Sequence, residues 1–198
     1  MITARTACLL ADYKRWANQR LFDSLVALPP GEVNKKRVSV FKNMIGTLNH
    51  VYVVDCIWQA HLEGRGHDFK TSHDLLHSDL IELRMAQKEL DHWYCDWSAR
   101  QTDASLDKPI EFNFVSGESG TMSAGAMLMH VVNHASYHRG WVVQMYFEIP
   151  AMPPVTDMPV YLRESEPVLL STLQVPTVTA PCAVQYSNAT SVLPDRYR

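Results

Sequence analysis

Four stretches of the chain carry apolar residues at steps of three and four, which is the spacing of an amphipathic α-helix. In the first stretch, apolar side chains recur from Leu10 to Leu28, and Pro29-Pro30-Gly31 ends the pattern. Lys14 and Asn18 fall elsewhere on the helical wheel. The spacing therefore predicts a first helix that ends at about residue 28.

The second and third stretches are predicted to be helices as well. The second begins at about Asn43, a suitable N-cap, and ends near Leu62, where Glu63-Gly64-Arg65-Gly66 follows. Its β-branched residues between Val51 and Ile57 would also suit a strand, but the length and the flanking caps favour a helix. The third helix is predicted from about Ser72 to Ala99.

A short alternating segment precedes the fourth stretch. Ile110-Glu111-Phe112-Asn113-Phe114 alternates apolar and polar residues, and Ser116-Gly117-Glu118-Ser119-Gly120 then turns the chain. We expect a short hairpin or an extended crossover there. The fourth helix spans about Ser123 to Glu148, and prolines from Pro150 onward end it.

These elements predict an all-α fold, an antiparallel four-helix bundle with one longer crossover connection. We assign the bundle to residues 1–164. Residues 165–198 are rich in Pro, Thr and Ser, contain few charges and show no helical period. They are expected to form a weakly structured C-terminal extension.

Composition and charge narrow the classes of function. The net charge of -3 leaves no basic excess to neutralise a phosphate backbone, so nucleic-acid binding is not expected. No run approaches 18 apolar residues, and charges interrupt the N-terminal segment, so neither a membrane span nor a signal peptide is predicted. The four cysteines are far apart and form no Cys-x-x-Cys pair. They are expected to be reduced thiols in a cytoplasmic protein.

The histidines are the most informative chemical groups. In the fourth helix, Met127, Val131, His134, His138, Trp141 and Met145 follow the spacing of a core-facing seam. His134 and His138 are four residues apart, so both rings can reach one cation. His50 lies in the second helix on a stripe with Val54, Ile57 and His61. Three imidazoles from two facing seams would converge on one divalent ion. The alternative is that they are core histidines bonded to side chains or carbonyls.

Other histidines compete for this role. His130 could replace one member of the triad, but Val131 fits the seam better, so we expect His130 beside the ligands or on the surface. His61, His67, His73 and His77 cluster around a glycine-rich loop and are expected to be solvated. Glu89-x-x-His92 resembles half of a di-iron motif, but the second half is missing.

Three segments together resemble the DinB family. They are Asp12-Tyr13-Lys14-Arg15-Trp16-Ala17-Asn18, Leu48-Asn49-His50 with Asp55 and Trp58 following, and Asn133-His134-Ala135-Ser136-Tyr137-His138-Arg139-Gly140. The resemblance covers residues 5–163 and implies a four-helix bundle that holds a divalent metal, seen as nickel, zinc or iron. The implied ligands are His50, His134 and His138. Family members are often homodimers.

The family resemblance also implies a chemistry, because characterised members include thiol transferases and a thiol-dependent isomerase. We therefore expect a metal-dependent enzyme that activates a thiol or water, either a thiol S-transferase or a hydrolase. Its substrate would be a small molecule, with a low-molecular-weight thiol as one candidate. The alternative is a non-catalytic metal-binding or stress-related structural protein. These alternatives differ in access, since a structural ion should be closed by a fourth protein ligand.

Several neighbours of the triad carry further expectations. Trp16, Trp58 and Trp141 are candidate pocket walls or core aromatics, and Trp141 stands where relatives often have Gln. Gly140 inside a helix suggests the close approach of another helix. Arg139 is expected either to hold a carboxylate such as that of Asp55 or to lie on the surface. Asp55 is five residues from His50 and so cannot share its face as a fourth ligand.

Overall fold

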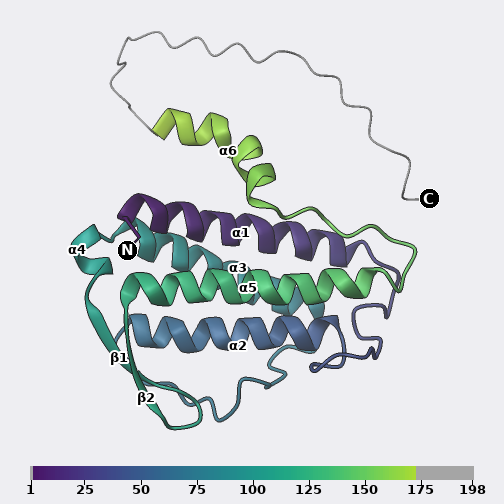
Figure 1. Ribbon diagram of the computed structural model, residues 1–198. Helices are drawn as coiled ribbons and strands as arrows, with labels where there is room; N and C mark the ends of the chain where they lie inside the picture. Colours follow the sequence, from purple (N-terminus) through teal and green to yellow (C-terminus); the bar gives the residue numbers. More distant parts are fainter. Residues whose placement is uncertain (1, 173–198) are drawn as a thin grey trace, which may run out of the picture. The chain divides into compact units, whose positions relative to one another are not determined.

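The computed structural model describes residues 2–172, with side chains as far as residue 165. Four long helices form the bundle: α1 (Ala4–Val26), α2 (Met44–Leu62), α3 (Leu80–Ala99) and α5 (Ala124–Tyr146). The shorter elements are α4 (Asp103–Leu106), β1 (Pro109–Asn113), β2 (Ser119–Ser123) and α6 (Met158–Thr172). The predicted all-α bundle is confirmed, and Figure 1 shows the four long helices side by side.

The four helices form a ring in which α1 packs on α3 and α5, and α2 packs on α3 and α5. Helices α1 and α5 run in one direction and α2 and α3 in the other (Figure 1). The pairs α1/α3 and α2/α5 are therefore antiparallel. Because α2 ends at the end of the bundle opposite to the start of α3, residues 63–79 must cross the length of the bundle. The connection that crosses the bundle therefore lies between α2 and α3, whereas the longer segment 100–123 between α3 and α5 contains α4 and the hairpin.

Side-chain caps fix where the helices begin. The Asn43 side chain accepts from the backbone N–H of Gly46, which confirms the predicted N-cap of α2. The predicted start of the third helix at Ser72 is wrong, because the side chain of Asp79 caps α3 at the N–H groups of Ile81 and Glu82. Residues 72–79 instead belong to the crossover connection.

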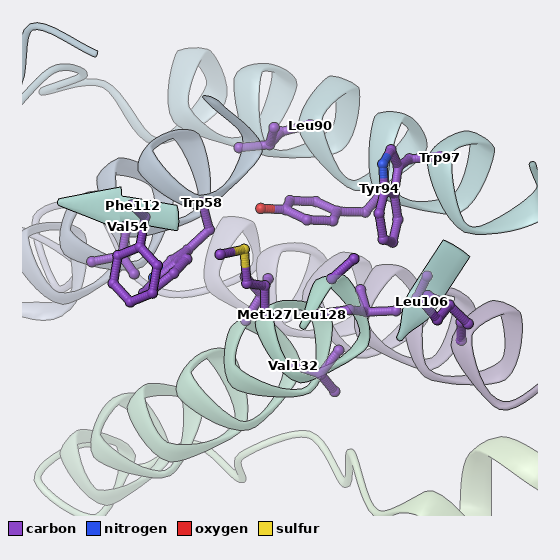
Figure 2. Close-up of a cluster of buried hydrophobic side chains, with 14 residues drawn as sticks. Val54, Trp58, Leu90, Tyr94, Trp97, Leu106, Phe112, Met127, Leu128 and Val132 are labelled. Atoms are coloured by element: carbon purple, nitrogen blue, oxygen red, sulfur yellow. The ribbon is translucent and has the colours of Figure 1, made fainter. Parts of the chain in front are cut away.

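Apolar side chains pack into two clusters along the bundle. One contains Trp58, Tyr94, Trp97, Met127 and Leu128, and Figure 2 shows these rings and side chains converging from several elements. The other contains Leu21, Leu25, Met44, Leu83 and Tyr146. Between the two clusters, each long helix also carries at least one buried polar side chain.

This polar band is buried, with side chains from four helices: Lys14, Asn18, Asp55, Gln87, Asp91 and Arg139. Lys14 Nζ lies 2.7 Å from Asp55 Oδ2 and 2.5 Å from Asp91 Oδ1. Burial alone would lower the pKa of Lys14, but the two carboxylates outweigh this effect and raise it, so the ammonium stays charged. Lys14 and Asn18 thus lie inside the bundle although they fall off the apolar stripe of the sequence.

Arg139 is also buried, which excludes the predicted surface position. It does not hold Asp55, which is paired with Lys14. Its guanidinium instead donates to Asn18 Oδ1 at 3.1 Å and to Ser136 Oγ at 2.8 Å. The arginine therefore joins α5 to α1.

The predicted hairpin is present as an antiparallel pair of strands, β1 and β2. Phe112 is paired with Gly120 in the register, and the phenyl ring covers this glycine. A Cβ at position 120 would lie 2.6 Å from Phe112 Cζ, so the absence of a side chain lets the ring pack there.

Residues 165–198 were predicted to form a weakly structured C-terminal extension. Helix α6 continues through residues 158–172, and the rest of the predicted extension, residues 173–198, lies outside the described residues. The division into a bundle of residues 1–164 and an extension stays a prediction. None of the helices in the described part of the chain has the length and apolarity that crossing a membrane requires.

Candidate metal centre

The structure brings His50, His134 and His138 together from α2 and α5. One nitrogen from each ring lies within 4.8 Å of the others. His50 Nε2 is 3.1 Å from His134 Nε2, and the ring centroids of His134 and His138 are 4.5 Å apart. His50 and His138 are buried, and His134 is half-buried. The predicted convergence of the two seams is therefore present.

The crossover connection fixes the orientation of His50. Nδ1 of this ring lies 2.7 Å from the backbone carbonyl oxygen of Ser72, which can only accept, so Nδ1 carries the proton. Nε2 therefore presents a lone pair toward His134. Asn49 strengthens the contact, because its side chain donates to the carbonyl of His77 and accepts from the N–H of that residue. Residues 72–77 are thereby held against α2.

His134 and His138 lack such partners. Within the described residues, Nδ1 of each ring is buried without a hydrogen bond. Burial, aided by the charges of neighbouring histidines, lowers the pKa of His134 to about 3 and that of His138 to about 4. Both rings are consequently neutral at pH 7. Apart from the 3.1 Å contact of His134 Nε2 with His50 Nε2, which lies within the cluster itself, hydrogen bonding does not account for their burial, and this weakens the alternative of satisfied core histidines.

The donor set fits a divalent transition metal. Neutral imidazoles suit zinc, nickel and iron, and two nitrogens bound to one tetrahedral ion at about 2.0–2.1 Å would lie about 3.3 Å apart. The separation of 3.1 Å between the His50 and His134 nitrogens is close to this value. Among the described residues, the cluster contains these three histidines and no carboxylate or thiol. The three histidines could therefore hold a metal ion and leave a coordination position open.

Aromatic rings cover the triad. The ring of Phe41 stacks on that of His50 at a centroid distance of 4.3 Å and meets His138 at 5.6 Å. Trp141 packs against His138 at 4.8 Å and against Phe41 at 5.8 Å. His73, which is exposed on the crossover connection, stacks on Phe41 at 5.3 Å. Phe41 was missed in the sequence, because it lies in a loop without periodicity.

The loop that carries Phe41 is held by unusual backbone features. Lys42 adopts a φ of 69°, a left-handed conformation that is uncommon for a residue with a side chain. A Cβ at Gly46 would overlap the carbonyl oxygen of Phe41, so only glycine lets the loop approach α2 this closely. The buried Arg37 guanidinium donates to the carbonyl oxygens of Glu32 and Lys35. The position of Phe41 is therefore determined by the loop itself.

The remaining histidines are placed as follows. His130 is half-buried beside the triad, with its ring centroid 5.6 Å from that of His134 and 4.9 Å from that of Trp58. The prediction that His61 is solvated is wrong, because it is buried against Trp58 and Phe112. Burial lowers the pKa of both His61 and His130. His67, half-buried beside His61, keeps a buried Nδ1 without a partner among the described residues.

The other expectations near the site have mixed outcomes. Trp141 packs against His138 of the triad and Trp58 packs against His130, whereas Trp16 packs on Tyr161 of α6. The close approach predicted at Gly140 is wrong, because no atom lies within 4 Å of where its Cβ would be.

The cysteines do not form a reactive centre in the described residues. Cys8, Cys56 and Cys95 are free thiols, and Cys182 lies outside the described residues. Burial raises the pKa of Cys56 and of Cys95 to about 11, so both are protonated at neutral pH. Neither Cys56 nor Cys95 is therefore a nucleophilic thiolate at neutral pH.

Comparisons with known proteins agree with the fold and with the family resemblance. A sequence model of the DinB family matches residues 1–169. The protein DinB of Bacillus subtilis (strain 168) is 31% identical over 162 residues, which cover 77% of this chain and 91% of that protein. A crystal structure of a DinB-like protein from Bacillus cereus ATCC 10987 has a TM-score of 0.53 at 14% identity, covering 73% of this chain and 91% of the other.

Proposed function

The chain belongs to the DinB family, and on that premise we propose that it is a metal-dependent enzyme acting on a small molecule. The observation that carries the proposal is the convergence of three neutral imidazoles from two helices, with His50 Nε2 only 3.1 Å from His134 Nε2. His50, His134 and His138 would hold one divalent ion, either nickel, zinc or iron. The substrate class that we propose is a low-molecular-weight thiol together with an electrophile, or a molecule that is hydrolysed.

The ion, when bound, supplies Lewis acidity that lowers the pKa of a thiol or a water molecule. The residues around it contribute orientation and shielding. The carbonyl of Ser72 holds the proton of His50 on Nδ1 and so keeps the lone pair of Nε2 toward the centre. Phe41 and Trp141 pack on the imidazoles and keep bulk water from that side.

The number of donors supports an enzyme over a structural metal site. Structural ions are usually closed by four protein ligands, whereas catalytic ions keep an open position. In the part of the chain that the structure describes, the cluster offers three ligands, and Asp55 is committed to Lys14 inside the bundle. A substrate atom could therefore take the free position.

The ligand assignment is tested by metal analysis of the purified protein and of three variants, His50→Ala, His134→Ala and His138→Ala. His92→Ala is the matched control, because His92 is exposed on α3 and is not a member of the cluster. We expect one metal ion per chain in the wild type and in the control, and loss of the metal in the three variants. Full occupancy in the His134→Ala and His138→Ala proteins would refute the ligands.

Catalysis is tested separately on the metal-loaded protein. Common cellular thiols are incubated with a chlorinated aromatic electrophile, with and without a chelator, and conjugate formation is measured. Metal-dependent conjugation supports the thiol transferase. If metal binds but neither conjugation nor hydrolysis depends on it, the non-catalytic metal-binding protein is the better description.

A further inference from the structure

A cavity of about 360 Å³ lies on the His134 side of the triad, between the β hairpin, α2 and α5. We infer that this cavity binds the uncharged, planar apolar part of a ligand, typically an aromatic ring, whose other end reaches the centre. The inference rests on the proposed function, because it names the class of molecule that the metal centre would act on. Three observations carry it.

The first is the chemistry of the walls. Among the described residues, the lining consists of apolar, aromatic, small polar and imidazole side chains and contains no Asp, Glu, Lys or Arg. Trp58 and Phe112 meet edge to face at a centroid distance of 4.9 Å, and Figure 2 shows them together at one end of the apolar cluster. A charged ligand group would lose its hydration here without finding an opposite charge, whereas an aromatic ring would be favoured by burial and edge-to-face contacts.

The second is the position of the cavity. His134, His130 and Ser72 all contribute to its lining. His134 is a proposed ligand, and Ser72 holds the ring of another, His50. A molecule in this cavity therefore lies against the triad itself, and not at a remote surface.

The third observation is the volume of the cavity, together with the difference between its lining and that of a second cavity near Phe41. An apolar cavity of about 150 Å³ is enough to hold benzene, so about 360 Å³ has room for one or two rings. A second cavity, of about 300 Å³, lies on the Phe41 side and is lined by Lys42 and Asp74 together with several polar residues. The second cavity contains no histidine of the triad in its lining, so the cavity without charged side chains is the one of the two that adjoins a proposed ligand, and it selects apolar groups.

Three matched probes test the cavity without requiring metal or turnover. Binding of 4-fluorotoluene, 4-fluorobenzoate and 4-fluorobenzylamine to the chelator-treated protein is measured by 19F NMR titration at pH 7. We expect the neutral ring to bind at least tenfold more tightly than either charged one. Equal affinities, or no saturable binding of 4-fluorotoluene, would overturn the inference.

A surface substitution locates the site without disturbing the core. Phe114 lines the cavity and is 48% exposed, so Phe114→Lys should fold and place a charge at the wall. This substitution should lower the binding affinity for 4-fluorotoluene at least threefold and raise the binding affinity for 4-fluorobenzoate. Phe147→Lys is the control, because Phe147 is 69% exposed and lies outside this lining. Equal effects of the two substitutions would also overturn the inference.

A second measurement links the cavity to the centre. Imidazole and 4-phenylimidazole are titrated into the cobalt-loaded protein, and the visible absorption of the ion is followed. The phenyl group should improve affinity at least tenfold, and Phe114→Lys should remove most of that gain. If the protein holds no metal, the proposed function fails while the fluorinated probes still decide the cavity. If metal binds but the phenyl group gives no gain, only the present inference fails.

Discussion

Nζ of Lys14 lies 2.7 Å from Oδ2 of Asp55, and neither side chain is exposed to solvent. Asp91 of α3 forms a second ion pair with the same ammonium group, so one buried cation joins three helices. Asp55 is on α2, the helix that carries His50. The ion pair therefore stabilises the part of the bundle on which the triad is built.

Replacing Lys14 with Met should strongly destabilise the fold. It would leave two carboxylates buried without their cation, a defect that costs about 3–5 kcal/mol. Urea denaturation followed by circular dichroism measures the change in the free energy of unfolding. Lys35→Met is the control, because Lys35 pairs with Glu32 at the surface and such pairs contribute about 1 kcal/mol or less. A similar decrease in the free energy of unfolding in both variants would contradict the larger contribution expected for the buried ion pair.

The stability of the metal-free protein should fall on acidification. The pKa values of His134 and His138 are about 3 and about 4 in the folded protein and about 6.5 in an unfolded chain. Between these values the unfolded chain binds protons that the folded protein does not, so the free energy of unfolding rises with pH and levels off above about 6.5. Denaturation series between pH 4 and pH 7.5 measure this slope. A His134→Gln/His138→Gln double variant should have a shallower slope, and an unchanged slope would contradict the assignment.

Gly140→Ala should stabilise the protein by about 0.5–1 kcal/mol. The glycine is exposed within α5, the added Cβ meets no atom within 4 Å, and alanine favours the helix. Gly125 of the same helix is the comparison, because its Cβ would lie 3.0 Å from Ile2 Cγ1 and 3.2 Å from the Leu106 carbonyl oxygen. Thermal unfolding of both variants measures the difference. Alanine should raise Tm at position 140, and it should raise Tm by a smaller amount or not at all at position 125.

Phe41→Ala should expose the proposed metal centre without removing its proposed ligands. The phenyl ring covers His50 and His138, so its loss should let a chromophoric chelator withdraw the metal several-fold faster. Stopped-flow absorbance gives the release rate, and metal analysis gives the stoichiometry, which should stay the same. Val40→Ala, at an exposed neighbouring position, should release metal at the wild-type rate. A reduced stoichiometry in Phe41→Ala would mean that the ring holds the site together rather than covers it.

The convergence of the three histidines could be predicted from the sequence because they lie on regular helices. The seam of α5 places His134 and His138 on one face, and the stripe of α2 places His50 opposite them. The position of each histidine on its own helix follows from the helical period. The choice of α2 as the helix that supplies the third histidine was supported by the family resemblance as well.

Tertiary contacts decided the features that the sequence did not predict. Lys14 looks like a surface residue on the helical wheel, and its burial depends on carboxylates from two other helices. The residues before Leu80 fit a helical pattern, but the Asp79 cap and the contact of Ser72 with His50 pull them into the crossover connection. Phe41 reaches the triad through a loop conformation that no periodicity specifies.

His50 and His134 are 84 residues apart, and α3 and the hairpin lie between them in the sequence. The three rings meet only through the packing of one helix on another, unlike ligands that sit a few positions apart in a zinc finger. Assembly of the bundle must therefore precede binding of a metal at the proposed centre. Metal content would then serve as a sensitive gauge of correct assembly, since a chain with separated helices would have no site to fill.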